Sequence, residues 1–95
     1  MEQRIRSEVT LNELMTGLAE EAAELAQAAL KYRRALYQTS PTPVSEDSAH
    51  ERLLEEIADV NLYLRVLGLN QKYIKEIEDR KLERWAKRLG VQTDA

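Results

Sequence analysis

The chain of 95 residues has a net charge of −3 at pH 7, with 43% hydrophobic and 33% charged residues and no cysteine. This length fits one domain, and the lack of cysteine excludes disulfides, thiolate zinc sites and cysteine nucleophiles. The acidic balance argues against a protein that binds nucleic acid over its whole surface. The sequence has neither a signal-peptide h-region nor an apolar run of ~18 residues. We therefore expect a soluble, cytoplasmic protein with no nucleic-acid or membrane partner.

The first predicted elements are an N-terminal segment and a long helix. Residues 1–9 form an arm or a short helix. Thr10-Leu-Asn-Glu13 has the T-x-x-E form of a capping box, in which side chains satisfy the free N–H groups at a helix start. Apolar residues then recur at helical spacing, which predicts a helix over 11–37. The next stretch, 38–48, holds both prolines and several Ser and Thr residues, so we expect a mobile loop.

Two more helices follow the loop. Ser48-Ala-His-Glu51 is a second capping box, and the apolar stripe after it predicts a helix over 49–68. Asn70 suits the N-cap of a third helix over 71–89, which carries its own apolar stripe. No strand pattern is present, so the sequence predicts an all-α protein.

The ends of these helices and their surfaces predict how they assemble. The third helix stops at Gly90, a residue typical of helix C-termini, and 91–95 form a frayed tail. Each helix has only one apolar side, so the three must pack together. We therefore expect a single domain over 1–95, built as a small antiparallel helical bundle. Its core is thin, and apolar residues remain that predict completion by oligomerisation: Leu30, Leu54, Leu62 and Leu69.

Pairs of carboxylates flank the apolar stripes of the first two long helices. At 100° per residue, Glu21 and Glu24 share a flank of the first helix. Glu56 and Asp59 take the matching place on the second. Either pair alone is compatible with a solvated acidic face, but antiparallel packing would bring the two pairs together. Four converging carboxylates require a cation, and Mg²⁺, with Mn²⁺ as a possible substitute, is the expected one. Small residues on the same flank allow a second helix to come close: Gly17, Ala28 and Ala35.

This pattern resembles the MazG-like all-α nucleoside triphosphate pyrophosphohydrolases, whose signature is E-E-x-x-E on one helix and E-x-x-D on the next. Here these motifs are Glu20-Glu21-Ala-Ala-Glu24 and Glu56-Ile-Ala-Asp59. The resemblance implies a Mg²⁺-dependent hydrolase that cleaves a nucleoside triphosphate between its α- and β-phosphates. The products would be a nucleoside monophosphate and pyrophosphate, and the protein would be a homodimer or homotetramer. The implied metal ligands are Glu21, Glu24, Glu56 and Asp59.

Other residues are candidates for proton transfer and for phosphate binding. A carboxylate that is not fully used as a ligand, Glu20 or Glu24, would take the proton of the attacking water. On the basic third helix, Lys81 falls on the apolar face and Arg84 flanks it, and such groups suit a triphosphate. Lys31 and Arg34 on the first long helix are further candidates for phosphate binding. Tyr63 on the second either forms a hydrogen bond with the ligand or only packs within the protein.

Two alternatives to this function stay open. A phosphoribosyl-ATP pyrophosphatase-like enzyme shares the fold and the E-E-x-x-E helix, but its aspartate is normally followed by Leu-Leu-Tyr-His, whereas this chain has Asp59-Val-Asn-Leu-Tyr63. A non-catalytic helical interaction module would use its exposed leucines and leave its acidic clusters in solvent. The resemblance is also weaker at one point, because some relatives place an aromatic base-stacking residue where this chain has Lys31 and Tyr32.

Overall fold

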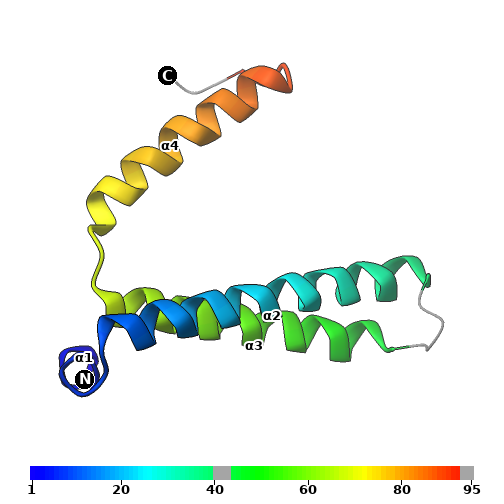
Figure 1. Ribbon diagram of the computed structural model, residues 1–95. Helices are drawn as coiled ribbons and strands as arrows, with labels where there is room; N and C mark the ends of the chain where they lie inside the picture. The colour runs from blue at the N-terminus through cyan, green and yellow to red at the C-terminus, as the bar shows by residue number, and fades with distance from the viewer. Residues whose placement is uncertain (40–43, 93–95) are drawn as a thin grey trace.

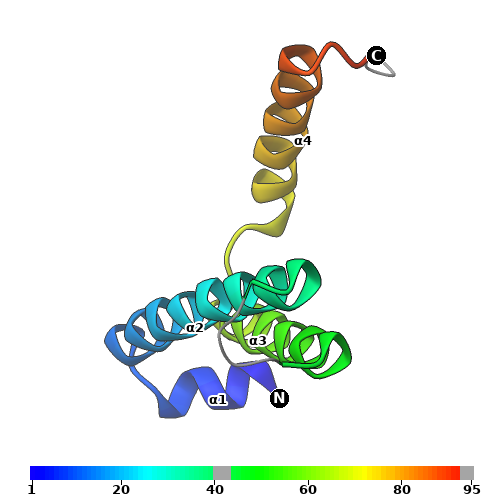
Figure 2. The ribbon, with the colours of Figure 1, turned by 90° about the vertical axis from the view of Figure 1, so that its right-hand side faces the viewer.

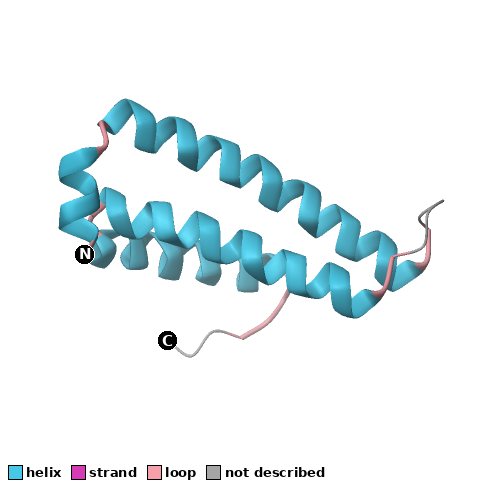
Figure 3. Ribbon diagram, turned by 90° about the horizontal axis from the view of Figure 1, so that it is seen from below, coloured by secondary structure: helices cyan, strands magenta, loops and turns pink. Residues whose placement is uncertain are grey.

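The structure is a computed structural model that describes residues 1–39 and 44–92, and every regular element in these ranges is an α-helix (Figure 3). The all-α prediction is therefore confirmed. None of the helices in the described ranges has both the length and the apolar character needed to cross a membrane. In chain order the helices are α1 (Glu2–Glu8), α2 (Leu11–Tyr37), α3 (Glu46–Leu67) and α4 (Gln71–Arg88) (Figure 1).

The starts of α2 and α4 follow the predicted caps. The Thr10 hydroxyl accepts a hydrogen bond from the Glu13 N–H at 3.0 Å, and the Asn70 side-chain oxygen accepts one from the Tyr73 N–H, also at 3.0 Å. Each contact satisfies an N–H group that has no partner within its helix. Because α2 ends at Tyr37, both bounds of this helix agree with the prediction.

The start of α3 lies one turn earlier than predicted. The cap is Ser45, whose hydroxyl accepts from the Ser48 N–H at 3.1 Å, and Glu46 and Asp47 occupy the first turn. Acidic residues there stabilise the positive end of the helix dipole, which explains why the earlier serine is used. The choice of Ser48 as the cap was therefore wrong. The predicted loop is correspondingly shorter at this end, and its residues 40–43, like tail residues 93–95, lie outside the described ranges.

The bundle consists of α1, α2 and α3, and α4 stands apart from it. Helices α2 and α3 run antiparallel side by side, α1 packs against α3, and α4 leaves on the side opposite α1 (Figures 1 and 2). Among the described residues, α4 packs against none of the other helices. The expectation that all three long helices pack together within one chain was wrong. The radius of gyration is 17.2 Å, whereas a compact chain of this length has about 12 Å, which reflects the projecting helix.

Small residues bring α2 and α3 close together. Gly17, Ala28 and Ala35 are all buried on one side of α2, as the small-residue flank predicted. The ring of Tyr63 on α3 lies directly over Gly17, and a Cβ atom at position 17 would overlap the ring. The glycine is required here for this close approach, which keeps the backbones of the two helices near each other. Ala49 is the corresponding small buried residue at the other end of α3.

The leucine stripes of α2 and α3 do not point at each other. At 100° per residue, Leu18 and Leu25 lie roughly a quarter-turn around α2 from the Gly17 side. Ile57 and Leu64 lie roughly a quarter-turn around α3 from its contact side in the same sense, so both stripes open onto one side of the hairpin. These side chains are only partly buried. We call this side the apolar face: Leu18, Leu25, Leu36, Leu53, Ile57 and Leu64.

Helix α1 holds the end of α3 in place. The Arg6 Nε donates a hydrogen bond to the Val66 carbonyl at 2.6 Å, and the Arg65 Nε donates to a Glu2 carboxylate oxygen at 3.1 Å. This contact with Arg65 holds the pKa of Glu2 below its ordinary value. Gly68 ends α3 with a φ of 64°, a left-handed conformation that favours glycine, and lies against the Arg6 guanidinium.

Candidate metal centre

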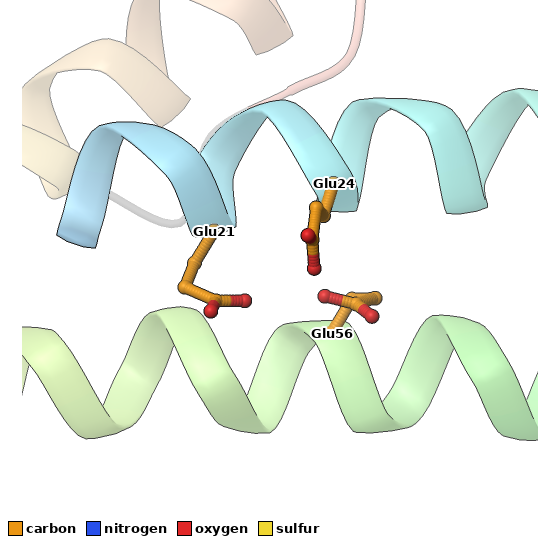
Figure 4. Close-up of side chains that lie close together, drawn as sticks. All are labelled: Glu21, Glu24 and Glu56. Atoms are coloured by element: carbon orange, nitrogen blue, oxygen red, sulfur yellow. The ribbon is translucent and has the colours of Figure 1, made fainter. Parts of the chain in front are cut away.

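Three carboxylates from two helices converge between α2 and α3. Glu21 and Glu24 come from α2 and Glu56 comes from α3, and one oxygen of each lies within 4.8 Å of the others. Figure 4 shows all three carboxyl groups directed into the space between the two helices. The close approach at Gly17 and the i,i+3 spacing of Glu21 and Glu24 produce this geometry, because both glutamates then face α3.

The cluster combines burial with like charge. Glu56 is only 2% exposed, and one of its oxygens forms an ion pair with the Arg52 guanidinium at 2.7 Å. In both Glu56 and Glu21 the carboxylate oxygen Oε2 is buried and has no hydrogen-bond partner among the described residues. Burial raises the pKa of Glu21, and the neighbouring charges of Glu24, Asp59 and Glu56 raise it further. Buried oxygens without partners, in a group of like charge, are a suitable ligand set for a hard cation.

The other predicted members of the site lie at its edge. Asp59 is exposed and outside the group of three, although its charge is near enough to raise the pKa of Glu21. Glu20 is also exposed and outside the group of three. Tyr63 packs its ring over Gly17, beside the carboxylates, so packing is the role that its surroundings explain.

The predicted phosphate-binding residues are divided between two places. Lys31 lines a hollow on α2 and α3 that Glu24 also lines, so it lies near the carboxylates. Lys81 and Arg84 lie on α4, which does not contact the bundle, so the structure does not bring them to the cluster within one chain. Tyr32, beside Lys31 in sequence, places its ring 5.3 Å from the ring of His50 and does not line that hollow.

Arg52 is the residue that the sequence reasoning missed. It pairs with the most buried carboxylate of the cluster and also lines the hollow that contains Lys31. The available signal was its position four residues before Glu56, which places the two side chains on one face of a helix. Such i,i+4 pairs are common on solvated helices, so the spacing alone does not mark a site.

Comparison with known proteins adds no further assignment to this geometry. No family model, no curated protein and no solved structure matches the chain.

Proposed function

We propose that the chain is a Mg²⁺-dependent, MazG-like nucleoside triphosphate pyrophosphohydrolase of the cytoplasm, which hydrolyses a (d)NTP to a nucleoside monophosphate and pyrophosphate. The observation that carries the proposal is the convergence of Glu21, Glu24 and Glu56, with two buried carboxylate oxygens that have no hydrogen-bond partner in the part of the chain that the structure describes. Leaving such oxygens unpaired destabilises a fold, so a ligand that satisfies them is favoured. The sequence motifs that contain these three residues support the same function.

The donor set fits Mg²⁺ and, by the same chemistry, Mn²⁺. All three groups offer carboxylate oxygen, which hard divalent cations prefer, and Asp59 is near enough to add a fourth. Mg²⁺ bound there would supply a Lewis acid for the phosphate and lower the pKa of a bound water. Exposed Glu24 borders open solvent, so substrate and water can reach this side of the cluster.

The proposed reaction requires one proton acceptor and one leaving group. The oxygen of water forms a bond to the α-phosphorus, and the bond from that phosphorus to the bridging oxygen breaks, which releases pyrophosphate. Glu24 or Glu20 takes the proton of the water. Glu24 is a member of the cluster, whereas Glu20 lies outside it, so the geometry favours Glu24. Buried Glu56, paired with Arg52, is better suited to a ligand role.

We also propose that a second copy of the chain covers the apolar face with its α4, which gives a homodimer or, by repetition, a homotetramer. Leu82 and Trp85 on α4 are 62% and 58% exposed, so this helix has an apolar surface of its own to bury. The charges are complementary, because α4 carries seven Lys/Arg against four Asp/Glu, whereas residues 1–67 carry seven against twelve. Lys81 and Arg84 would then reach carboxylates of a partner copy.

A screen of ribo- and deoxyribonucleoside triphosphates with Mg²⁺ or Mn²⁺ and detection of pyrophosphate tests the proposed activity. We expect release of pyrophosphate that is lost in Glu56→Gln and kept in Glu55→Gln, an exposed neighbour outside the cluster. Cleavage of phosphoribosyl-ATP in preference to every triphosphate would instead select the alternative enzyme. Silence with all substrates and both metals would contradict catalysis and favour the interaction module.

A further inference from the structure

A basic hollow adjoins the carboxylate cluster on the side of the hairpin opposite the apolar face. Its volume is about 610 Å³, and it lies between the C-terminal half of α2 and the first turns of α3. Glu24 lines the hollow and also belongs to the cluster, so the two sites share a wall. The basic residues that line it are Lys31, Arg34 and Arg52.

The positive charge of this hollow is only partly neutralised. Arg52 pairs with Glu56, but Lys31 and Arg34 form no ion pair with any carboxylate in the described ranges. Ser48 and Ala49, in the first turns of α3, line the same hollow, so the positive end of this helix dipole adds to the potential. Three cationic side chains at one concavity attract a ligand with several negative charges.

The size and the charge of the hollow select a class of ligand. A volume of about 610 Å³ is within the range of small-molecule sites and exceeds what a single carboxylate or sulfate needs. Two guanidinium groups favour phosphate oxygens, which they can contact in a bidentate way. The neighbouring carboxylates would repel an anion unless a cation lies between them, which suits a polyphosphate that shares a metal ion with the cluster.

We infer that this basic hollow receives the β- and γ-phosphates of the nucleoside triphosphate, and that Arg52 joins it to the metal centre. The inference rests on the proposed function, because it assigns one part of the same substrate. Arg52 is 57% exposed, so its guanidinium can turn from Glu56 toward the hollow once another cation neutralises Glu56. Arg52 thus competes with the metal for Glu56 but assists in binding the phosphates.

Calorimetric titration of the full chain tests this assignment. The probes are MgCl₂ alone, then pyrophosphate at saturating Mg²⁺, with sulfate as a simpler anion. The variants are Arg34→Gln and Arg52→Gln, and the matched control is Arg33→Gln, which removes the same charge from α2 outside the hollow. Each hollow variant should weaken pyrophosphate binding about tenfold, since a charge-assisted hydrogen bond is lost, while the control binds like the wild type. Arg52→Gln should bind Mg²⁺ alone at least as tightly as the wild type.

The outcomes separate the inference from the proposed function. If Arg34→Gln, Arg52→Gln and Arg33→Gln bind pyrophosphate equally well, the hollow is not the phosphate site, even if hydrolysis depends on Glu56. Sulfate bound as tightly as pyrophosphate would overturn the polyphosphate assignment. If no triphosphate is hydrolysed but pyrophosphate binding still depends on both arginines, the hollow stands and the proposed enzyme does not. Exposed Arg34 keeps the test valid if Arg52→Gln fails to fold.

Discussion

Replacing Glu56 by Gln separates a metal centre from a solvated acidic patch. The change removes the charge of a side chain that is 2% exposed and keeps its shape. In the absence of metal two effects oppose each other. The variant loses the ion pair with Arg52, which contributes about 0.2–1 kcal/mol for a pair with an exposed partner, and it also loses the repulsion by Glu24. We therefore expect the metal-free stability to change by no more than about 1 kcal/mol.

The effect of Mg²⁺ on stability should differ much more between the two proteins. A ligand at ten times its dissociation constant stabilises the folded state by about 1.4 kcal/mol. For a domain of this size that raises the melting temperature by roughly 6–11 °C. The wild type should show this increase, and Glu56→Gln should lose most of it because a charged ligand is missing. The two proteins are compared at one protein concentration, since assembly also changes the melting temperature.

Thermal melts followed by circular dichroism, with EDTA and with increasing MgCl₂, measure this difference. The control is Glu55→Gln, which removes the same charge from the next residue of α3 but lies outside the cluster. It should respond to Mg²⁺ like the wild type. If Glu56→Gln is stabilised by Mg²⁺ as much as the wild type, Glu56 is no ligand and the reasoning from its buried, unpartnered oxygen is refuted.

Three further predictions follow from the packing and the charges. Because the pKa of Glu21 is raised, the metal-free folded state loses stability as the pH rises from about 4.5 through the raised pKa. In melts with EDTA, the stability of Glu21→Gln should therefore depend less on pH than that of the wild type, and an equal dependence would contradict this. Gly17→Ala should lower the free energy of unfolding, measured in urea, by about 1–3 kcal/mol because the new methyl group overlaps Tyr63. Adding Tyr63→Leu to this variant should reduce the loss, and full stability of Gly17→Ala would count against the close contact. Trp85→Glu should shift sedimentation toward the monomer with unchanged helicity, whereas an unaltered sedimentation profile would argue against assembly through α4.

Local features of the fold could be predicted from the sequence because short-range chemistry determines them. The hydroxyl of Thr10 and the amide of Asn70 fix the starts of α2 and α4, and the small residues around Gly17 mark the surface through which α3 approaches. The start of α3 was missed because two serines, each followed by a plausible first turn, compete for the same cap. Only the three-dimensional structure shows that Ser45 is used.

Long-range features were harder to predict because they depend on which surfaces meet. The leucine stripes looked like the core of a three-helix bundle, but α3 packs against the small-residue flank of α2, and both stripes are left on one side of the pair. An apolar stripe on α4 does not say whether its partner lies in the same chain or in another copy. For the candidate site, the spacing of Glu21, Glu24 and Glu56 was enough to predict that they converge. Arg52 was not predicted, since its ion pair matters only once Glu56 is known to be buried.

The short link between α3 and α4 sets the direction of the whole of α4. Arg6 fixes the end of α3 at Gly68, and only Leu69 and Asn70 separate that anchored point from the first turn of α4. A helix of 18 residues is about 27 Å long, so a rotation of roughly 20° in the link would move its far end by about 9 Å. A small torsional change in two residues is thus amplified into a displacement close to the diameter of a helix. Whatever surface receives α4 therefore determines its direction.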